Sequence, residues 1–171
     1  MQTINLGYRV ILIALGSNLP SRAGNSTETL RAALEALAQM SVTPTWVSPF
    51  YATPAWPDPA DPSYVNAVAR VETALAPDAL MAVLHAVEHN FNRVRGVRNA
   101  PRTLDLDLLD YNGRIADGPP VLPHPRMESR GFVLVPLADI APRWMHPVSG
   151  RDVRELIDAL PEADRQIERI G

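Results

Sequence analysis

Two carboxylates stand two residues apart in a leucine-rich run, Pro-Arg-Thr-Leu-Asp-Leu-Asp-Leu-Leu, over residues 101–109. If this run is a β-strand, its side chains alternate between the two faces of a sheet. Asp105 and Asp107 then project side by side from one face, roughly 7 Å apart from Cα to Cα, while the leucines face the core. Two like charges this close repel each other unless a positive group lies between them. Mg²⁺ would satisfy the pair, because it takes carboxylate and phosphate oxygens as ligands.

The residues just before this run distinguish a metal site from an edge strand with a solvated polar face, which shows the same alternation. Four arginines lie within ten residues that contain no acid: Arg93, Arg95, Arg98 and Arg102. A charge cluster usually marks a solvated surface. Positive charges beside metal-binding carboxylates are, however, typical of polyphosphate sites, where metal ions bridge phosphate oxygens and arginines neutralise the developing charge. The two features together favour a phosphate-transfer site.

The composition excludes several classes of protein. All sixteen basic residues are arginine, so a P-loop nucleotidase, a protein kinase or a Schiff-base enzyme, each of which needs a lysine, is excluded. The chain has no cysteine, which excludes a disulfide framework and a cysteine-ligated zinc site. The net charge of −3 argues against a basic protein that binds nucleic acid.

The size and the apolar content predict one folded domain over residues 1–171. The apolar run at 10–15 is too short to span a membrane and lacks the basic flank of a signal sequence. The absence of cysteine fits a reducing compartment. We therefore expect a cytoplasmic protein with no membrane partner.

The apolar periodicity predicts the elements that must position these side chains. Alternating or continuous apolar runs predict four strands, and helical spacing after Asn25 and after Pro77 predicts two longer helices. The strands are expected at 8–15, 42–51, 64–73 and 103–111, proline-rich or arginine-bearing loops at 53–62 and 93–102, and two short helices at 132–140 and 153–160. This order predicts an α+β, ferredoxin-like βαββαβ fold, with a mainly antiparallel sheet, helices on one face and C-terminal helical additions.

Three other functions compete at this point. His85, Glu88 and His89 match the H-x-x-E-H pattern of zinc peptidases, although two histidines on a helix surface explain the same spacing. A nucleic-acid-binding module can share the ferredoxin-like topology, but paired aspartates on its sheet would repel a phosphate backbone. A Mg²⁺-dependent nuclease or phosphohydrolase would use the same carboxylates.

Several segments, in order and at compatible spacing, resemble the 6-hydroxymethyl-7,8-dihydropterin pyrophosphokinases of folate biosynthesis. The resemblance runs from about residue 8 to 160, and the run 101–109 is its most specific part. The other segments are Ile-Ala-Leu-Gly-Ser-Asn-Leu at 13–19, Tyr-Ala-Thr-Pro at 51–54, Tyr-Val-Asn-Ala at 64–67, the stretch 88–95, Pro-His-Pro-Arg-Met at 123–127 and Arg-Gly-Phe at 130–132. The family fold is a ferredoxin-like monomer, in agreement with the predicted element order.

The resemblance implies transfer of pyrophosphate from ATP to the hydroxymethyl group of the pterin, with release of AMP. By this likeness Asp105 and Asp107 hold two Mg²⁺ ions, and Arg93 and Arg102 assist catalysis. The implied ATP-binding residues are Arg95, Arg98, Leu108, His124 and Arg130. The implied pterin-binding residues are Thr53, Pro54, Tyr64, Asn66 and Phe132, of which the two aromatics would enclose the flat ring. One departure concerns Asn99-Ala100, which stands where a Trp-Gly pair is common in the family.

Overall fold

The computed structural model of the protein describes residues 9–93 and 100–171. In chain order its elements are β1 (Ile11–Ser17), α1 (Ser26–Gln39), β2 (Thr43–Val47), β3 (Phe50–Thr53), β4 (Tyr64–Glu72), α2 (Pro77–Asn90), β5 (Asp105–Tyr111), the 3₁₀ helix η1 (Met127–Ser129), α3 (Gly131–Ile140), α4 (Val153–Asp158), α5 (Glu162–Arg165) and β6 (Glu168–Ile170). Among these residues no helix is long and apolar enough to cross a membrane.

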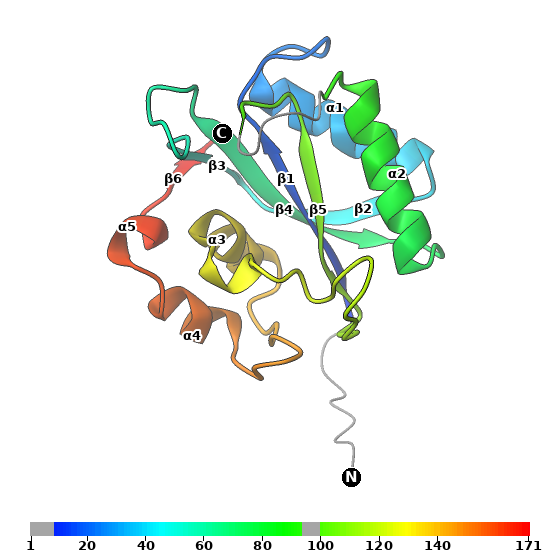
Figure 1. Ribbon diagram of the computed structural model, residues 1–171, viewed down its shortest axis with the longest axis vertical. Helices are drawn as coiled ribbons and strands as arrows, with labels where there is room; N and C mark the ends of the chain where they lie inside the picture. Colours follow the sequence, from blue (N-terminus) through cyan, green and yellow to red (C-terminus); the bar gives the residue numbers. More distant parts are fainter. Residues whose placement is uncertain (1–8, 94–99) are drawn as a thin grey trace.

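The described strands form one antiparallel sheet in the order β5-β1-β4-β3-β6, with β2 also paired to β4 (Figure 1). The inner part of this order is that of a ferredoxin-like sheet, in which the first and last strands of the motif lie side by side. The predicted α+β fold class is therefore confirmed.

The predicted strand at 42–51 is in fact two strands separated by Ser48 and Pro49. Proline has no amide hydrogen to donate to the sheet, and the Ser48 side chain takes part in pairing instead. Its hydroxyl accepts a bond from the Val68 amide at 3.0 Å, while its own amide donates to the Val68 carbonyl at 2.9 Å. Both β2 and β3 therefore remain attached to β4, with a break between them.

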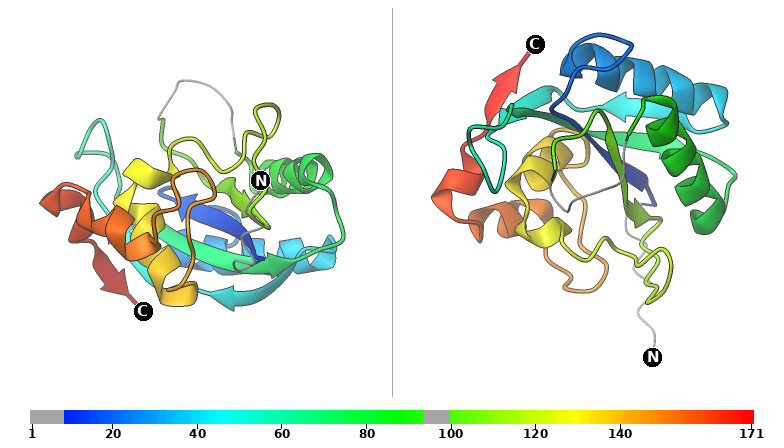
Figure 2. Two further views of the ribbon diagram at one scale, coloured as in Figure 1. Left: turned by 90° about the horizontal axis from the view of Figure 1, so that it is seen from below. Right: turned by 45° about the horizontal axis from the view of Figure 1, so that its top comes forward.

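The helices α1 and α2 lie side by side on one face of the sheet (Figures 1 and 2). The expected helix start at Asn25 is confirmed: its Oδ1 accepts from the Glu28 amide at 3.0 Å, and Glu28 Oε2 accepts from the Asn25 amide at 2.8 Å. Pro77 begins α2, as its fixed φ favours. Both helices bury apolar residues, among them Leu30, Leu37 and Leu84, against alternate residues of the strands, among them Ile13, Leu15, Ala67, Ala69 and Leu106.

The C-terminal additions α3 and α4 cover part of the opposite face with a second apolar cluster. The register of β1 and β5 shifts between Leu12 and Ile13, so that the consecutive residues Leu109 and Asp110 both lie on this second face. Asp110 is buried there and accepts a bond from Trp144 Nε1 at 2.7 Å. The end of this face that carries Asp105 and Asp107 is less deeply buried, and the candidate site lies there.

The chain after Leu160, in which the sequence indicates no element, forms α5 and β6. Glu168–Ile170 pair with Phe50–Ala52 and so add a strand to the free edge of β3. The segment is too short to show a period of its own, and its conformation depends on the edge that it meets.

Candidate active site

Gly16 lies at the centre of the polar end of the sheet. On one side it pairs with Asn66 of β4, and on the other with Asp105 of β5. A Cβ atom at this position would lie 3.2 Å from Asn66 Oδ1 and 3.9 Å from both Tyr64 Cδ1 and the Asp105 Cβ. Because glycine has no side chain, the space above residue 16, between Asp105 on one side and Tyr64 and Asn66 on the other, stays open.

The alternation expected of the leucine-rich run is confirmed. Leu104, Leu106 and Leu108 are buried in the main core, and Asp105 and Asp107 lie on the other face of β5. Their side chains are 26% and 34% exposed, so both carboxylates are reachable from solvent. The strand thus presents two oxygen ligands side by side at the open end of the sheet.

Positive charge surrounds this pair. Arg93 Nη1 donates to Asp105 Oδ1 at 2.6 Å, and Arg102 Nη1 donates to Asp105 Oδ2 at 3.0 Å. On the other side, Arg130 Nη1 lies 3.8 Å from Asp107 Oδ2. Arginines from the loop before β5 and from the start of α3 therefore converge on the two carboxylates, an arrangement suited to a bound polyphosphate.

The surroundings shift the protonation of two of these groups. Burial, and then repulsion by Asp105, raises the pKa of Asp107. Burial lowers the pKa of His124, against the opposing attraction of Asp107. His124 is therefore neutral at pH 7, and its Nδ1 accepts from the Arg126 amide at 3.2 Å. Since Nδ1 accepts, we assign the ring proton to Nε2, where it can be donated to a phosphate oxygen.

Glu88, which the sequence offers only as part of the zinc-peptidase pattern and as the start of the family-like stretch 88–95, has a different role in the structure. Its carboxylate is buried, accepts the Leu106 amide at 2.8 Å and forms an ion pair with Arg93. Through these contacts it links the C-terminal end of α2 to β5 and holds Arg93 beside Asp105. The available signal is an acid on the apolar face of a helix, beside Val87 and one turn after Leu84.

Asn18 is a second such residue, because its buried side chain connects two loops. Its Nδ2 donates to the Pro62 carbonyl at 3.0 Å, in the proline-rich loop after β3. Its Oδ1 accepts the Arg102 amide at 2.8 Å, at the end of the arginine loop. The sequence names Asn18 only within the family-like segment 13–19; in the structure β1 continues to Ser17, and Asn18 then connects the two loops.

We expect Asn18→Ala to lower kcat/KM by about 10- to 100-fold, because both loops lose a side-chain contact that positions them. Stability should fall by about 1–3 kcal/mol, since the Arg102 amide and the Pro62 carbonyl lose their partner. Steady-state kinetics and thermal unfolding measure the two effects, with the exposed Asn90→Ala as the control. A kcat/KM within twofold of the wild type would contradict this role.

The proposed ring pocket is built from two adjacent strands and the start of α3. Thr53 pairs directly with Tyr64, and Asn66 Nδ2 donates to Thr53 Oγ1 at 2.8 Å. Pro54 follows directly after β3 and is exposed. Phe132 stands in the first turn of α3, with the Arg130 guanidinium 5.4 Å from its ring centre. The structure therefore brings Thr53, Tyr64 and Asn66 together. Phe132 lies beside Arg130, the arginine that faces Asp107.

Three expected site residues lie elsewhere or outside the description. The Leu108 side chain is buried in the main core, facing away from the carboxylates. Arg95 and Arg98 fall outside the described residues, as does Asn99. The part of the arginine loop that the structure describes, Arg93 and residues 100–102, still places two of the four arginines on Asp105.

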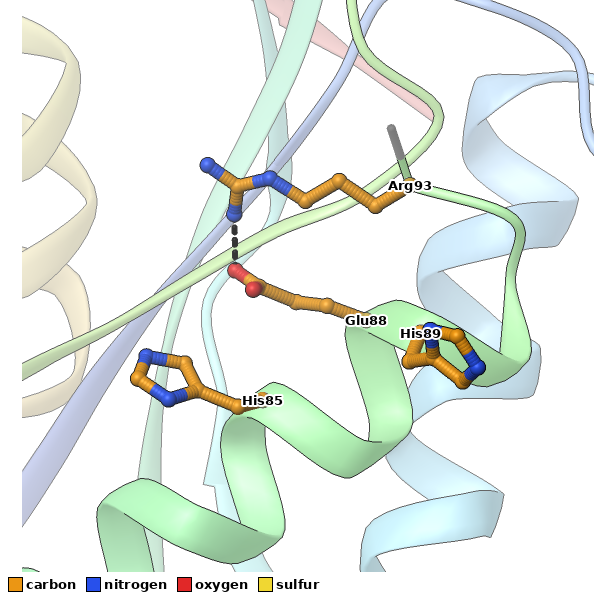
Figure 3. A pocket seen from close by; sticks show the side chains of 4 residues that line it. All are labelled: His85, Glu88, His89 and Arg93. Atoms are coloured by element: carbon orange, nitrogen blue, oxygen red, sulfur yellow. Dashed lines mark hydrogen bonds and ion pairs between the residues drawn. The ribbon is translucent and has the colours of Figure 1, made fainter. Parts of the chain in front are cut away.

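The helix histidines line a cleft beside the site. A cleft of about 240 Å³ is lined by His85, Glu88, His89 and Arg93. Figure 3 shows Glu88 directed at Arg93, with the two imidazole rings on opposite sides of the Glu88 side chain. Within residues 9–93 and 100–171, no three His, Asp or Glu side chains gather as a metal site. The zinc-peptidase interpretation therefore has no assembled ligand set among these residues.

Comparison with known proteins identifies the family. Residues 12–142 match the model of the 7,8-dihydro-6-hydroxymethylpterin-pyrophosphokinase family. A 2-amino-4-hydroxy-6-hydroxymethyldihydropteridine pyrophosphokinase of Pseudomonas aeruginosa is 41% identical over 88% of this chain and 91% of its own. One from Methylorubrum extorquens is 37% identical over 92% of this chain and 96% of its own.

Solved structures support the same fold. The HPPK-DHPS triple mutant of Plasmodium falciparum matches 94% of this chain with a TM-score of 0.69 at 12% identity. This chain spans 46% of the length of that one. The chain therefore belongs to the 7,8-dihydro-6-hydroxymethylpterin-pyrophosphokinase family, which confirms the resemblance found in its sequence and the pyrophosphokinase activity expected from it.

Proposed function

We propose that Asp105 and Asp107 hold two Mg²⁺ ions on the phosphates of ATP while the hydroxymethyl group of the dihydropterin takes up the pyrophosphate. The observation that carries this proposal is the placement of two solvent-reachable carboxylates side by side among converging arginines. Two carboxylates alone leave most of the ligand positions of Mg²⁺ to phosphate oxygens and water, which is how Mg²⁺ is commonly bound at phosphate-transfer sites. The donor set therefore fits the metal.

Bound Mg²⁺ supplies charge neutralisation at the phosphates and acidifies a coordinated hydroxyl. The arginines of the chain neutralise the remaining negative charge on the phosphates. Arg93 and Arg102 both donate to Asp105, and we propose that they turn to phosphate oxygens when the metal takes the carboxylate. His124 and Arg130 bind the nucleotide phosphates from the opposite side, and Arg95 and Arg98 complete the proposed ATP-binding set.

Leu108 contributes to the proposed nucleotide site through its backbone alone, because its side chain is buried in the core. On the other side of Gly16, the pterin ring lies between Tyr64 and Phe132. Asn66 and the backbone around Thr53 and Pro54 bind the polar edge of the ring. Gly16 separates the two substrates only by its backbone, so the hydroxymethyl oxygen can approach the β-phosphorus.

The competing functions lack support from the site. A nuclease or phosphohydrolase would need the carboxylates and arginines but not the cluster of Thr53, Tyr64 and Asn66. An RNA-binding module would need an accessible basic sheet face, whereas here the sheet presents Asp105 and Asp107. The family match also favours pyrophosphoryl transfer over both.

Metal counting tests the proposed site directly. With α,β-methylene ATP, whose α–β bridge resists cleavage, we expect two Mn²⁺ ions per chain by electron paramagnetic resonance titration. Asp105→Ala and Asp107→Ala should each bind fewer, and the exposed Asp117→Asn should keep two. The pKa of Asp107 is raised, so protons should compete with the metal for this carboxylate at pH values above the ordinary aspartate range. The affinity for Mn²⁺ should therefore begin to fall at these pH values as the pH decreases. Two ions retained in both alanine variants would overturn the assignment.

We further propose that residues 1–171 act as a single-domain monomer in the cytoplasm with ATP and the pterin as the small-molecule partners. The resemblance to the family implies the monomer and the substrates, and the cysteine-free composition fits a reducing compartment. Sedimentation equilibrium at working concentration tests the monomer, and a dimer mass would contradict it.

A further inference from the structure

The C-terminal segment 162–170 contacts two elements that carry residues of the proposed ring pocket, β3 with Thr53 and α3 with Phe132. At one end, β6 adds to the free edge of β3, with Glu168 opposite Ala52 and Arg169 opposite Tyr51 (Figure 1). The next residue of β3 is Thr53, and the side chain of Ile170 packs against the main core. The strand that leads into the pocket is thus bound on its outer side by β6.

At the other end, α5 packs on the first residue of α3. A Cβ atom added to Gly131 would lie 1.6 Å from the Asp164 carbonyl oxygen, so the backbone of α5 lies directly against this glycine. Gly131 stands between Arg130, which faces Asp107, and Phe132, which the proposed site places on one face of the ring. Any displacement of α5 therefore acts on the start of α3.

A side-chain hydrogen bond also joins β3 directly to α3. The Tyr51 hydroxyl of β3 donates to Asp139 Oδ2 of α3 at 2.6 Å. Burial and this carboxylate raise the pKa of Tyr51 to about 12, so the phenol remains protonated and keeps donating at physiological pH. This bond holds Tyr51 to the C-terminal part of α3. The contacts of the C-terminal segment then determine how far the end of β3 lies from the start of α3.

We propose that residues 162–170 are a positioning element that sets the spacing between the two parts of the ring pocket that β3 and α3 carry. They touch no substrate; they fix Thr53, at the edge of the ring, through β6, and Phe132, on one of its faces, through α5. A planar ring loses stacking contact with Phe132 or hydrogen bonds along its edge when this spacing changes, whereas phosphates held by charge tolerate a small shift. Loss of this segment should therefore weaken pterin binding selectively. The inference rests on the proposed assignment of Thr53 and Phe132 to the pterin site.

Two substitutions test this from opposite ends. Ile170→Asp should undock β6, and Gly131→Ala should push α5 away from α3. In each full-length variant we expect the Kd of the dihydropterin, measured with Mg²⁺ and α,β-methylene ATP, to rise at least tenfold. The Kd of the nucleotide analogue and kcat at saturation should stay within threefold. Faster hydrogen exchange of the β3 amides in Ile170→Asp would verify the undocking.

The matched control is Ile157→Ala, a partly buried residue of α4 in the same helical layer. It should lower stability without changing the Kd of the pterin. The inference is overturned if pterin binding in both variants stays within twofold of the wild type, or if pterin and nucleotide weaken equally. A wild-type protein that binds nucleotide but no dihydropterin would instead overturn the proposed function, so the two failures are distinguishable.

Discussion

Replacing Asp107 by alanine should lower kcat at least about 1,000-fold while leaving the fold intact. A metal ion contributes several kcal/mol to stabilising charge in the transition state, and each 1.4 kcal/mol changes the rate tenfold. Asp107 lies on the open face of β5, whereas the strand is anchored by leucines on the other face. Because its pKa is raised by burial and by Asp105, removing this carboxylate should also relieve repulsion in the metal-free protein.

Rapid-quench kinetics and thermal unfolding separate the two parts of this prediction. The exposed Asp117→Asn serves as the control and should keep wild-type turnover. Thermal stability of Asp107→Ala should equal or exceed that of the wild type in the absence of metal. A kcat within tenfold of the wild type would contradict a metal-binding role for Asp107.

Replacing Glu88 by alanine should lower the free energy of unfolding by about 3 kcal/mol, the lower end of the cost of breaking a buried ion pair. The substitution leaves the Leu106 amide without an acceptor and Arg93 without its buried partner. For a chain of this length the melting temperature should fall by about 6–12 °C. Turnover should fall as well, because Arg93 is no longer held in place from α2.

Glu88→Gln divides this effect into its two contributions. The amide oxygen still accepts from Leu106, so we expect most of the stability to return while the charge that positions Arg93 remains lost. Chemical denaturation of both variants measures the difference, with the exposed Glu35→Ala of α1 as the control. A free energy of unfolding within 1 kcal/mol of the wild type for Glu88→Ala would contradict the assigned contacts.

The fold follows from the sequence wherever periodicity extends over a whole element. The alternation of 103–111, the helical spacing after Asn25 and the proline at 77 predict β5, α1 and α2, and all three are confirmed. The break at Ser48 and Pro49 is missed, because the apolar run on either side masks it. The strand β6 is missed because three residues have no period, and they become a strand only through the free edge of β3.

For the site, the sequence predicts what depends on near neighbours along the chain. The alternation of Asp105 and Asp107 and the arginines before them are local patterns, and the structure brings these groups together. Glu88 and Asn18 lie in segments that the sequence singles out, but their contacts are missed because the partners are distant: Leu106 lies 18 residues from Glu88, Pro62 lies 44 from Asn18, and Arg102 lies 84 from Asn18. Their buried polar side chains have a role only after the tertiary fold forms.

The central claim is transfer of an intact pyrophosphoryl group to the dihydropterin, and the position of the phosphorus label tests it most directly. The protein is incubated with Mg²⁺, 6-hydroxymethyl-7,8-dihydropterin and ATP labelled at the γ-phosphorus, and the products are separated. We predict labelled pterin diphosphate and unlabelled AMP in equal amounts, with neither formed when the pterin is omitted. Label released as orthophosphate or free pyrophosphate, or ADP formed in place of AMP, would contradict the account.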